Sequence, residues 1–177
     1  RVSQFCADIY GHAVGEQTIQ DAETTAHENL EGFQTRVEEL LPCAAILNGD
    51  ETGLRVQDKL QWVHGLGSSL LTWYGLHAHK GLQAIKDFGI LVHFKGRLIH
   101  DCLAAYFELS CRHGLCNAHL LRELNFIFET FHQEWAEKMR RLLLDMNKRV
   151  NELKLLGRVR LSHAERASWI KRYKALL

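Results

Sequence analysis

The sequence lacks any long apolar run and carries almost no net charge. No hydrophobic stretch is long enough to cross a bilayer, and no signal-peptide pattern is present. The formal charge of +1 excludes a uniformly basic surface, but it allows a basic face opposed by an acidic pocket. With 46% hydrophobic residues, the 177-residue chain can bury a core. We therefore expect a cytoplasmic protein with no membrane partner, built as one domain or one domain with an appendage.

Cysteine and proline are also scarce. The five cysteines are odd in number and widely scattered, which argues against a disulfide framework. The single proline, Pro42, ends a helical pattern. The chain begins at Arg1 and stops at Leu177 inside another helical pattern, so we expect a fragment of a longer protein.

The first 42 residues carry two helical patterns separated by a glycine-containing break. Apolar residues recur at helical spacing over residues 2–10 and again from Ile19 to Leu40. Such a pair is compatible with a DNA-binding helix-turn-helix or with a simple packing hairpin. The second helix is rich in acids, which phosphates would repel, so the packing hairpin is favoured.

The pattern changes at residue 43 and again after residue 119. Strands are expected at 43–48, 60–67, 70–78, 97–100 and 112–118, with helices at 80–91 and 102–109. This order predicts a mixed α/β plan with a central sheet. Residues beyond 119 are helical, with a stop at Gly157 and a capping box from Ser162 to Glu165 that opens a last helix.

Two aspartates follow predicted strands. Asp50 comes after the first strand, and Asp101 comes directly after the strand at 97–100. If these strands are neighbours, the carboxylates converge beyond their carboxyl ends, where oxygen ligands suit Mg²⁺ or Mn²⁺. A pair of such ions can activate a nucleophile and stabilise the leaving oxygen of a phosphodiester. The alternative is that both aspartates are ordinary turn residues.

Long stretches of the chain resemble the insertion-sequence-sixty-six family of bacterial transposases. The matching segments are "DETGLRV" (50–56), "KLQWVHGLGSSLLTWYGLHAHKG" (59–81), "GILVHFKGRLIHDCLAAYF" (89–107), "CRHGLCNAHLLREL" (111–124) and "WAEKMRRLLLDMNKRV" (135–150). The resemblance implies a ribonuclease-H-like α/β core at 43–119, an N-terminal helical segment at 1–42 and a truncated helical insertion at 120–177.

The resemblance also implies a metal-binding triad of two aspartates and a glutamate. Asp50 and Asp101 match the two aspartates and would hold two divalent ions in the parent protein. The family's third acid belongs to a motif with paired asparagines, which is absent here; "HAER" lacks those asparagines, so Glu165 is not assigned. Cys102 and Leu103 stand where the family has glycine and tryptophan. We therefore expect the chain to be inactive alone.

A cysteine and histidine cluster precedes the helical tail. Cys111, His113, Cys116 and His119 lie within nine residues. Zinc is not expected, because structural zinc sites draw ligand pairs from two separated turns. The family carries a Cys-x-x-His signature that Cys116 and His119 match, which implies neighbours of the active site. Glu123 is a second candidate third acid, although a solvent-facing helix position is favoured.

The helical tail is rich in cations. Those we expect to contact DNA phosphates are Lys138, Arg140, Arg141, Lys148 and Arg149; the alternative is a solvated helix face with opposite-charge pairs. The resemblance implies double-stranded DNA as partner, at the ends of the element and at its target, a homo-oligomer in the parent, and a nucleoid-associated bacterial location. The runner-up hypotheses are a catalytically dead DNA-binding or oligomerisation remnant and a small zinc module.

Overall fold

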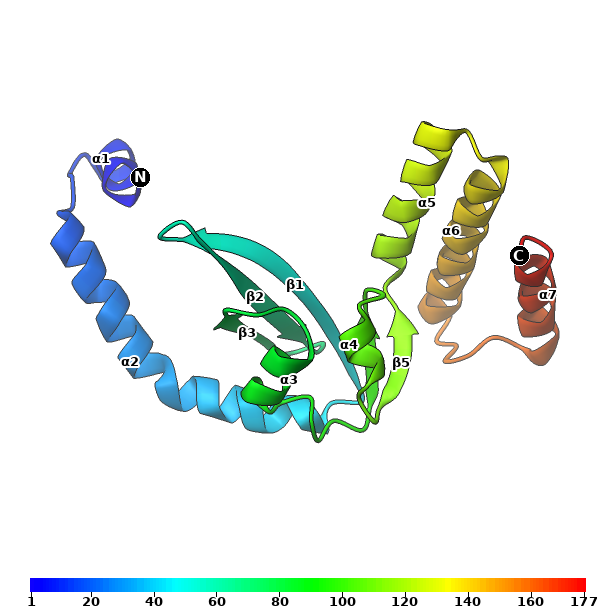
Figure 1. Cartoon of the computed structure of the whole chain (residues 1–177), viewed down its shortest axis with the longest axis horizontal. Helices are drawn as coiled ribbons and strands as arrows, with labels where there is room; N and C mark the ends of the chain where they lie inside the picture. Colours follow the sequence, from blue (N-terminus) through cyan, green and yellow to red (C-terminus); the bar gives the residue numbers. More distant parts are fainter. The chain divides into compact units, whose positions relative to one another are not determined.

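The computed structural model describes residues 1–177 (Figure 1). Two compact units make up the chain, Arg1–Gly114 and Leu115–Leu177, and each is described by itself. The division predicted from the sequence, with boundaries at residues 42 and 119, stays a prediction.

The first unit is built on a five-stranded mixed sheet. Its strands lie in the order β3-β2-β1-β4-β5. Their bounds are β1 Ile46–Val56, β2 Lys59–Gly67, β3 Thr72–His77, β4 Arg97–His100 and β5 Arg112–Leu115. β1, β2 and β3 form an antiparallel meander, whereas β4 runs parallel to β1. This order and these directions are those of a ribonuclease-H-like sheet, so the predicted fold class is confirmed.

The β1–β2 hairpin is longer than the sequence pattern predicts. Its two-residue turn, Gln57 and Asp58, has positive φ angles of 49° and 60°, which suits the twist of a tight hairpin. The predicted first strand, residues 43–48, is therefore wrong at both ends, because β1 begins at Ile46 and continues to Val56. It is also buried on one face only, since Leu47 is buried while Ile46 and Asn48 are exposed.

One face of the sheet carries the core of the first unit. Leu47, Leu66 and Trp73, from three neighbouring strands, pack there with residues of three helices, which are α2 (Glu16–Leu40), α3 (Leu82–Phe88) and α4 (Ala104–Phe107). Trp73 also donates a hydrogen bond from Nε1 to Glu38 Oε1 at 2.8 Å. Gly75 makes room for this packing, because an added Cβ would lie 2.1 Å from the Trp73 ring. The helix α1 (Val2–Tyr10) and the short 3₁₀ turn η1 (Leu41–Cys43) complete the unit.

The second unit is helical. Its helices are α5 (Asn117–Phe131), α6 (Glu134–Leu155) and α7 (His163–Lys174). Figure 1 shows α5 and α6 side by side, and Leu124, Ala136, Met139 and Leu142 form their shared core. The predicted capping box is confirmed: Ser162 accepts from the Glu165 N–H, and the Glu165 side chain accepts from the Ser162 N–H. None of the helices combines the length and the apolar character needed to span a membrane.

Candidate metal centre

Asp50 and Asp101 lie at the point where β1 and β4 separate. The parallel pairing of these strands covers only Ile46 to Asn48 of β1, so Asp50 follows just after the last pair. Asp101 follows β4 directly, as predicted. The prediction that Asp50 ends its strand is wrong, because the antiparallel ladder continues and pairs Asp50 with Gly65 of β2. The ladder tolerates a carboxylate there because it uses only backbone groups.

A third carboxylate joins these two. One oxygen each from Asp50, Glu51 and Asp101 lie within 4.8 Å of one another. Glu51 is not among the site residues predicted from the sequence, because alternation along a strand puts adjacent side chains on opposite faces. β4 does not pair with β1 beyond Asn48, so no neighbouring strand lies beside β1 on this side at Asp50 and Glu51. Side chains from both faces of β1 can therefore meet around this open edge. The adjacent acids in "DET" were the only signal available in the sequence.

Glu51 is an unusual carboxylate because its side chain is fully buried. Neither of its oxygens has a hydrogen-bond partner of good geometry. The nearest cation is Lys80, whose Nζ lies 4.0 Å from Oε2. His64 Nδ1 lies 3.9 Å from Oε1, but burial lowers the pKa of this imidazole and so disfavours its charged form. A buried acceptor without a hydrogen bond is costly, so this position calls for an additional partner.

The surroundings of Glu51 shift its ionisation. Burial raises the pKa of the Glu51 carboxyl above its ordinary value. The neighbouring Tyr106 hydroxyl and the Lys80 ammonium oppose the rise, whereas the charges of Asp101 and Asp50 add to it. The Tyr106 hydroxyl is buried beside these acids, and burial raises its pKa as well. Gly49 admits Tyr106 here, since an added Cβ would lie 3.2 Å from the hydroxyl oxygen.

Asp101 is held by the backbone that follows it. Its Oδ1 accepts from the Leu103 N–H at 2.9 Å, and the ring of His100 contacts the Asp101 carbonyl oxygen through Nδ1. His100 Nε2 lies 3.2 Å from His113 Nδ1, and His113 Nε2 lies 3.2 Å from the Leu109 carbonyl. A carbonyl only accepts, so His113 Nε2 donates there. The rings of His100 and His113 therefore lie against the turn that presents Asp101, each in contact with a carbonyl oxygen.

The donor set fits a hard divalent cation. All three side chains offer oxygen, which suits Mg²⁺ or Mn²⁺ rather than a metal that prefers sulfur or nitrogen. Three carboxylates with one nearby lysine leave excess negative charge, and a cation would offset it. The two buried Glu51 oxygens, which lack hydrogen bonds, would gain a partner in the same step.

The remaining predicted site residues lie elsewhere in the chain. Cys116 is the N-cap of α5, and His119 and Glu123 belong to the first turns of α5 in the second unit. Their predicted role beside an active site stays a prediction. The run from Cys111 to His119 does not bring ligand atoms together as the three carboxylates do, and the two ring nitrogens of His113 face the His100 ring and the Leu109 carbonyl.

Most of the cations predicted to contact DNA are already paired. Arg140 and Arg141 both contact Glu137, each through Nε at 2.6 Å, and together they lower the Glu137 pKa to about 2. Arg149 contacts Glu165 at 2.6 Å. Lys138 pairs with Glu134 at 3.4 Å, and Lys148 forms no ion pair. Their assignment to DNA stays a prediction.

The fold and the acid cluster define a ribonuclease-H-like protein with a candidate divalent-metal centre. The chain belongs to the IS66 family of transposases, whose family model matches residues 1–177.

Comparison with curated proteins gave no match. Solved structures include similar chains. One is a chain in the cryo-EM structure of the simian T-cell lymphotropic virus intasome in complex with PP2A regulatory subunit B56 gamma. It is 15% identical, with a TM-score of 0.33, over 48% of this chain and 41% of that chain. Another is the HTLV-2 integrase catalytic core domain in complex with magnesium (trimeric form). It is 12% identical, with a TM-score of 0.31, over 50% of this chain and 74% of that chain. The match to the intasome chain therefore spans less than half of that chain's length.

Proposed function

We propose that this chain carries the metal-binding part of a DNA transposase catalytic core. Asp50 and Asp101 hold Mg²⁺ or Mn²⁺, with Glu51 completing the set of carboxylates. The observation that supports this most directly is the convergence of three carboxylates, one of them buried without a hydrogen bond, in a member of a transposase family. The parent protein would cleave and join DNA strands by phosphoryl transfer.

The roles of the protein groups follow from their positions. A bound divalent ion lowers the pKa of its water and stabilises negative charge on the phosphodiester oxygens. Asp101, fixed by the Leu103 N–H, presents its carboxylate from one strand, and Asp50 presents its carboxylate from the neighbouring strand. Lys80 lies over the Trp62 ring, 5.1 Å from its centroid, and from there offsets part of the charge on Glu51. Two ions are expected in the parent.

The proposed partner is double-stranded DNA, at the element ends and at a target site. A homo-oligomer in the parent and a nucleoid-associated location in a bacterium belong to the same proposal. They are supported by membership of the transposase family.

The proposal is tested by Mn²⁺ binding, measured from the electron paramagnetic resonance signal of the free ion. The wild-type chain should bind Mn²⁺, and Asp50→Asn and Asp101→Asn should each weaken binding at least about tenfold, as loss of groups at a metal site generally does. The matched control is Asp58→Asn, which makes the same chemical change in the hairpin turn, roughly 20 Å along the strand from Asp50. Equal affinity in Asp101→Asn and Asp58→Asn would reject the site.

A nicking assay separates this function from that of a catalytically dead DNA-binding remnant. The 177 residues hold no Ala-Glu-Arg motif flanked by paired asparagines, so we expect Mn²⁺ binding without cleavage of supercoiled DNA. Nicking that disappears in Asp101→Asn would show instead that the three carboxylates suffice. If DNA binding is unchanged by chelators and by Asp50→Asn, and the chain binds no Mn²⁺, the result would favour the catalytically dead DNA-binding remnant.

A further inference from the structure

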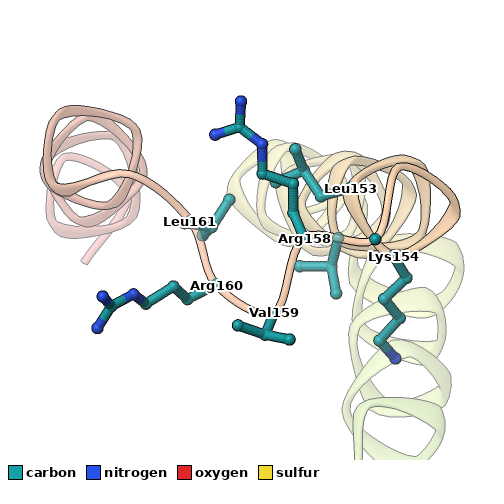
Figure 2. Close-up of a pocket in the computed structure, with 8 residues that line it drawn as sticks. Leu153, Lys154, Arg158, Val159, Arg160 and Leu161 are labelled. Carbon is teal, nitrogen blue, oxygen red and sulfur yellow. The ribbon is translucent and has the colours of Figure 1, made fainter.

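The loop between α6 and α7 forms a pocket that no catalytic role accounts for. The pocket has a volume of about 490 Å³ (Figure 2). Apolar side chains from the end of α6 and from the loop line it together with cations; the lining residues are Val150, Leu153, Lys154, Gly157, Arg158, Val159, Arg160 and Leu161. No acidic residue lines the pocket, so its charge is of one sign.

The loop is held at both ends. At the end of α6 the Arg158 N–H donates to the Leu153 carbonyl at 2.9 Å, and the Gly157 N–H donates to the Lys154 carbonyl at 3.0 Å. These two bonds, with Gly157 at φ 69°, form a Schellman cap. At the other end, the capping box of Ser162 begins α7. The segment between these caps is therefore a short, preorganised loop rather than a linker.

The loop cations differ from the paired arginines of these helices. Arg141 and Arg149, for example, pair with carboxylates on α6 or α7. Lys154, Arg158 and Arg160 are exposed and form no ion pair. Figure 2 shows their charged ends pointing outward in different directions. A single small anion would not reach all three, whereas a polymer with regularly spaced negative charges would.

The apolar tip of the loop also faces solvent. Val159 stands between Arg158 and Arg160, and 97% of its surface is exposed. Proteins that contact the minor groove combine arginines with exposed apolar side chains in this way, the arginines meeting the negative potential of the groove and its phosphates. The loop therefore matches duplex DNA in charge and in surface character.

We propose that the α6–α7 loop is a DNA-contacting element, with Arg158 and Arg160 on the phosphate backbone and Val159 at the groove. This inference rests on the proposed function in taking DNA as the partner, but it assigns the contact to residues outside the acid cluster. It also moves the main DNA contact away from the paired cations of α6.

The test is binding of a fluorescently labelled mixed-sequence duplex, followed by anisotropy at several salt concentrations with EDTA present. Each phosphate contact contributes about 0.9 to the slope of log affinity against log salt. Arg158→Ala with Arg160→Ala should therefore reduce the slope by about 1.8 and weaken binding roughly 10- to 100-fold near 0.1 M salt. Val159→Ser should weaken binding without changing the slope.

The control is Lys138→Ala with Arg141→Ala, which removes the same two charges from exposed, paired positions on α6. It should change the slope by less than half as much as the loop variant. Thermal unfolding should be unchanged in both variants because the four side chains are exposed.

Equal slope changes in the two double variants would overturn the assignment. Self-association of the wild type that the loop variant abolishes, without DNA binding, would overturn it in favour of an interface between copies. Because EDTA is present, the DNA-binding measurement does not depend on metal at the acid cluster. A negative result for the loop therefore leaves the test of the metal site, Mn²⁺ binding by Asp101→Asn, unaffected.

Discussion

Glu51→Gln should stabilise the metal-free chain and destabilise the metal-loaded one. The wild-type carboxylate is fully buried, and its oxygens have no hydrogen bond. A buried polar group in that state costs about 1–3 kcal/mol, and more when it is charged. Glutamine has nearly the same shape as glutamate without the charge. The substitution also removes the carboxylate that lies near Lys80, which offsets part of the gain. We therefore expect a net gain of about 1–2 kcal/mol in the free energy of unfolding at neutral pH.

Added Mn²⁺ should reverse the order of stability. At a concentration of about 100 times the dissociation constant, the wild type gains roughly 2.7 kcal/mol. If Glu51→Gln weakens binding about 100-fold, the variant gains only about 0.4 kcal/mol under the same conditions. The ion would then stabilise the wild type by about 2.3 kcal/mol more than the variant, which exceeds the gain expected without metal.

The assay is thermal unfolding followed by circular dichroism, in EDTA and in MnCl₂. For a chain of this size, 1 kcal/mol corresponds to about 2–4 °C in Tm, so both effects are measurable. The advantage of glutamine in EDTA should shrink as the pH falls through the raised pKa of Glu51, since a protonated glutamate is as neutral as glutamine. A variant that is no more stable in EDTA, and that gains as much from Mn²⁺ as the wild type, would refute the reasoning.

Three further predictions concern the framework around the sites. Gly96→Ala should destabilise the β1–β4 pairing by more than about 1 kcal/mol, because an added Cβ would lie 2.7 Å from the Ala45 carbonyl oxygen. Urea unfolding measures this loss of stability, and an unchanged midpoint would contradict the prediction. Ser162→Ala removes the N-cap of α7 and should cost about 1 kcal/mol in thermal unfolding, whereas Ser162→Asp should largely restore it. The Arg149 guanidinium and the Ser162 cap lower the Glu165 pKa to about 2, so their stabilising effect is complete above the ordinary glutamate pKa and is lost as the pH falls toward 2. Glu165→Gln should therefore flatten the acid limb of a helicity titration, and an unaltered limb would exclude the pair as its cause.

The sequence predicts the regular parts of the fold well. The hairpin of β2 and β3 follows from apolar and aromatic runs separated by a serine pair, and β4 follows from "RLIH". The cap at Ser162 depends on residues three positions apart, so local chemistry is sufficient to identify it. The convergence of Asp50 with Asp101 follows once β1 and β4 are taken as neighbours.

The candidate site is only partly predictable, because its missing member depends on where a strand loses its partner. Glu51 joins the cluster only because β4 stops pairing with β1 after Asn48, and no sequence pattern gives the length of a parallel pairing. The polar residues around Asp50 suggest a loop, yet the ladder to β2 keeps them in a strand. The preorganised loop at Arg158 likewise depends on backbone bonds to Leu153 that a charge count does not reveal.

The early end of the β1–β4 pairing also has a consequence for solubility. Beyond Asn48, β1 pairs with β2 on one side only, so its other side is an open edge that invites strand addition by another chain. Leu54 and Val56 are exposed along this edge, which would favour such aggregation. The charge of Asp50, which is exposed, opposes it by repulsion between copies. Asp50 would thus serve both metal binding and protection of this edge, and Asp50→Asn should promote amyloid-like association, detectable by thioflavin fluorescence.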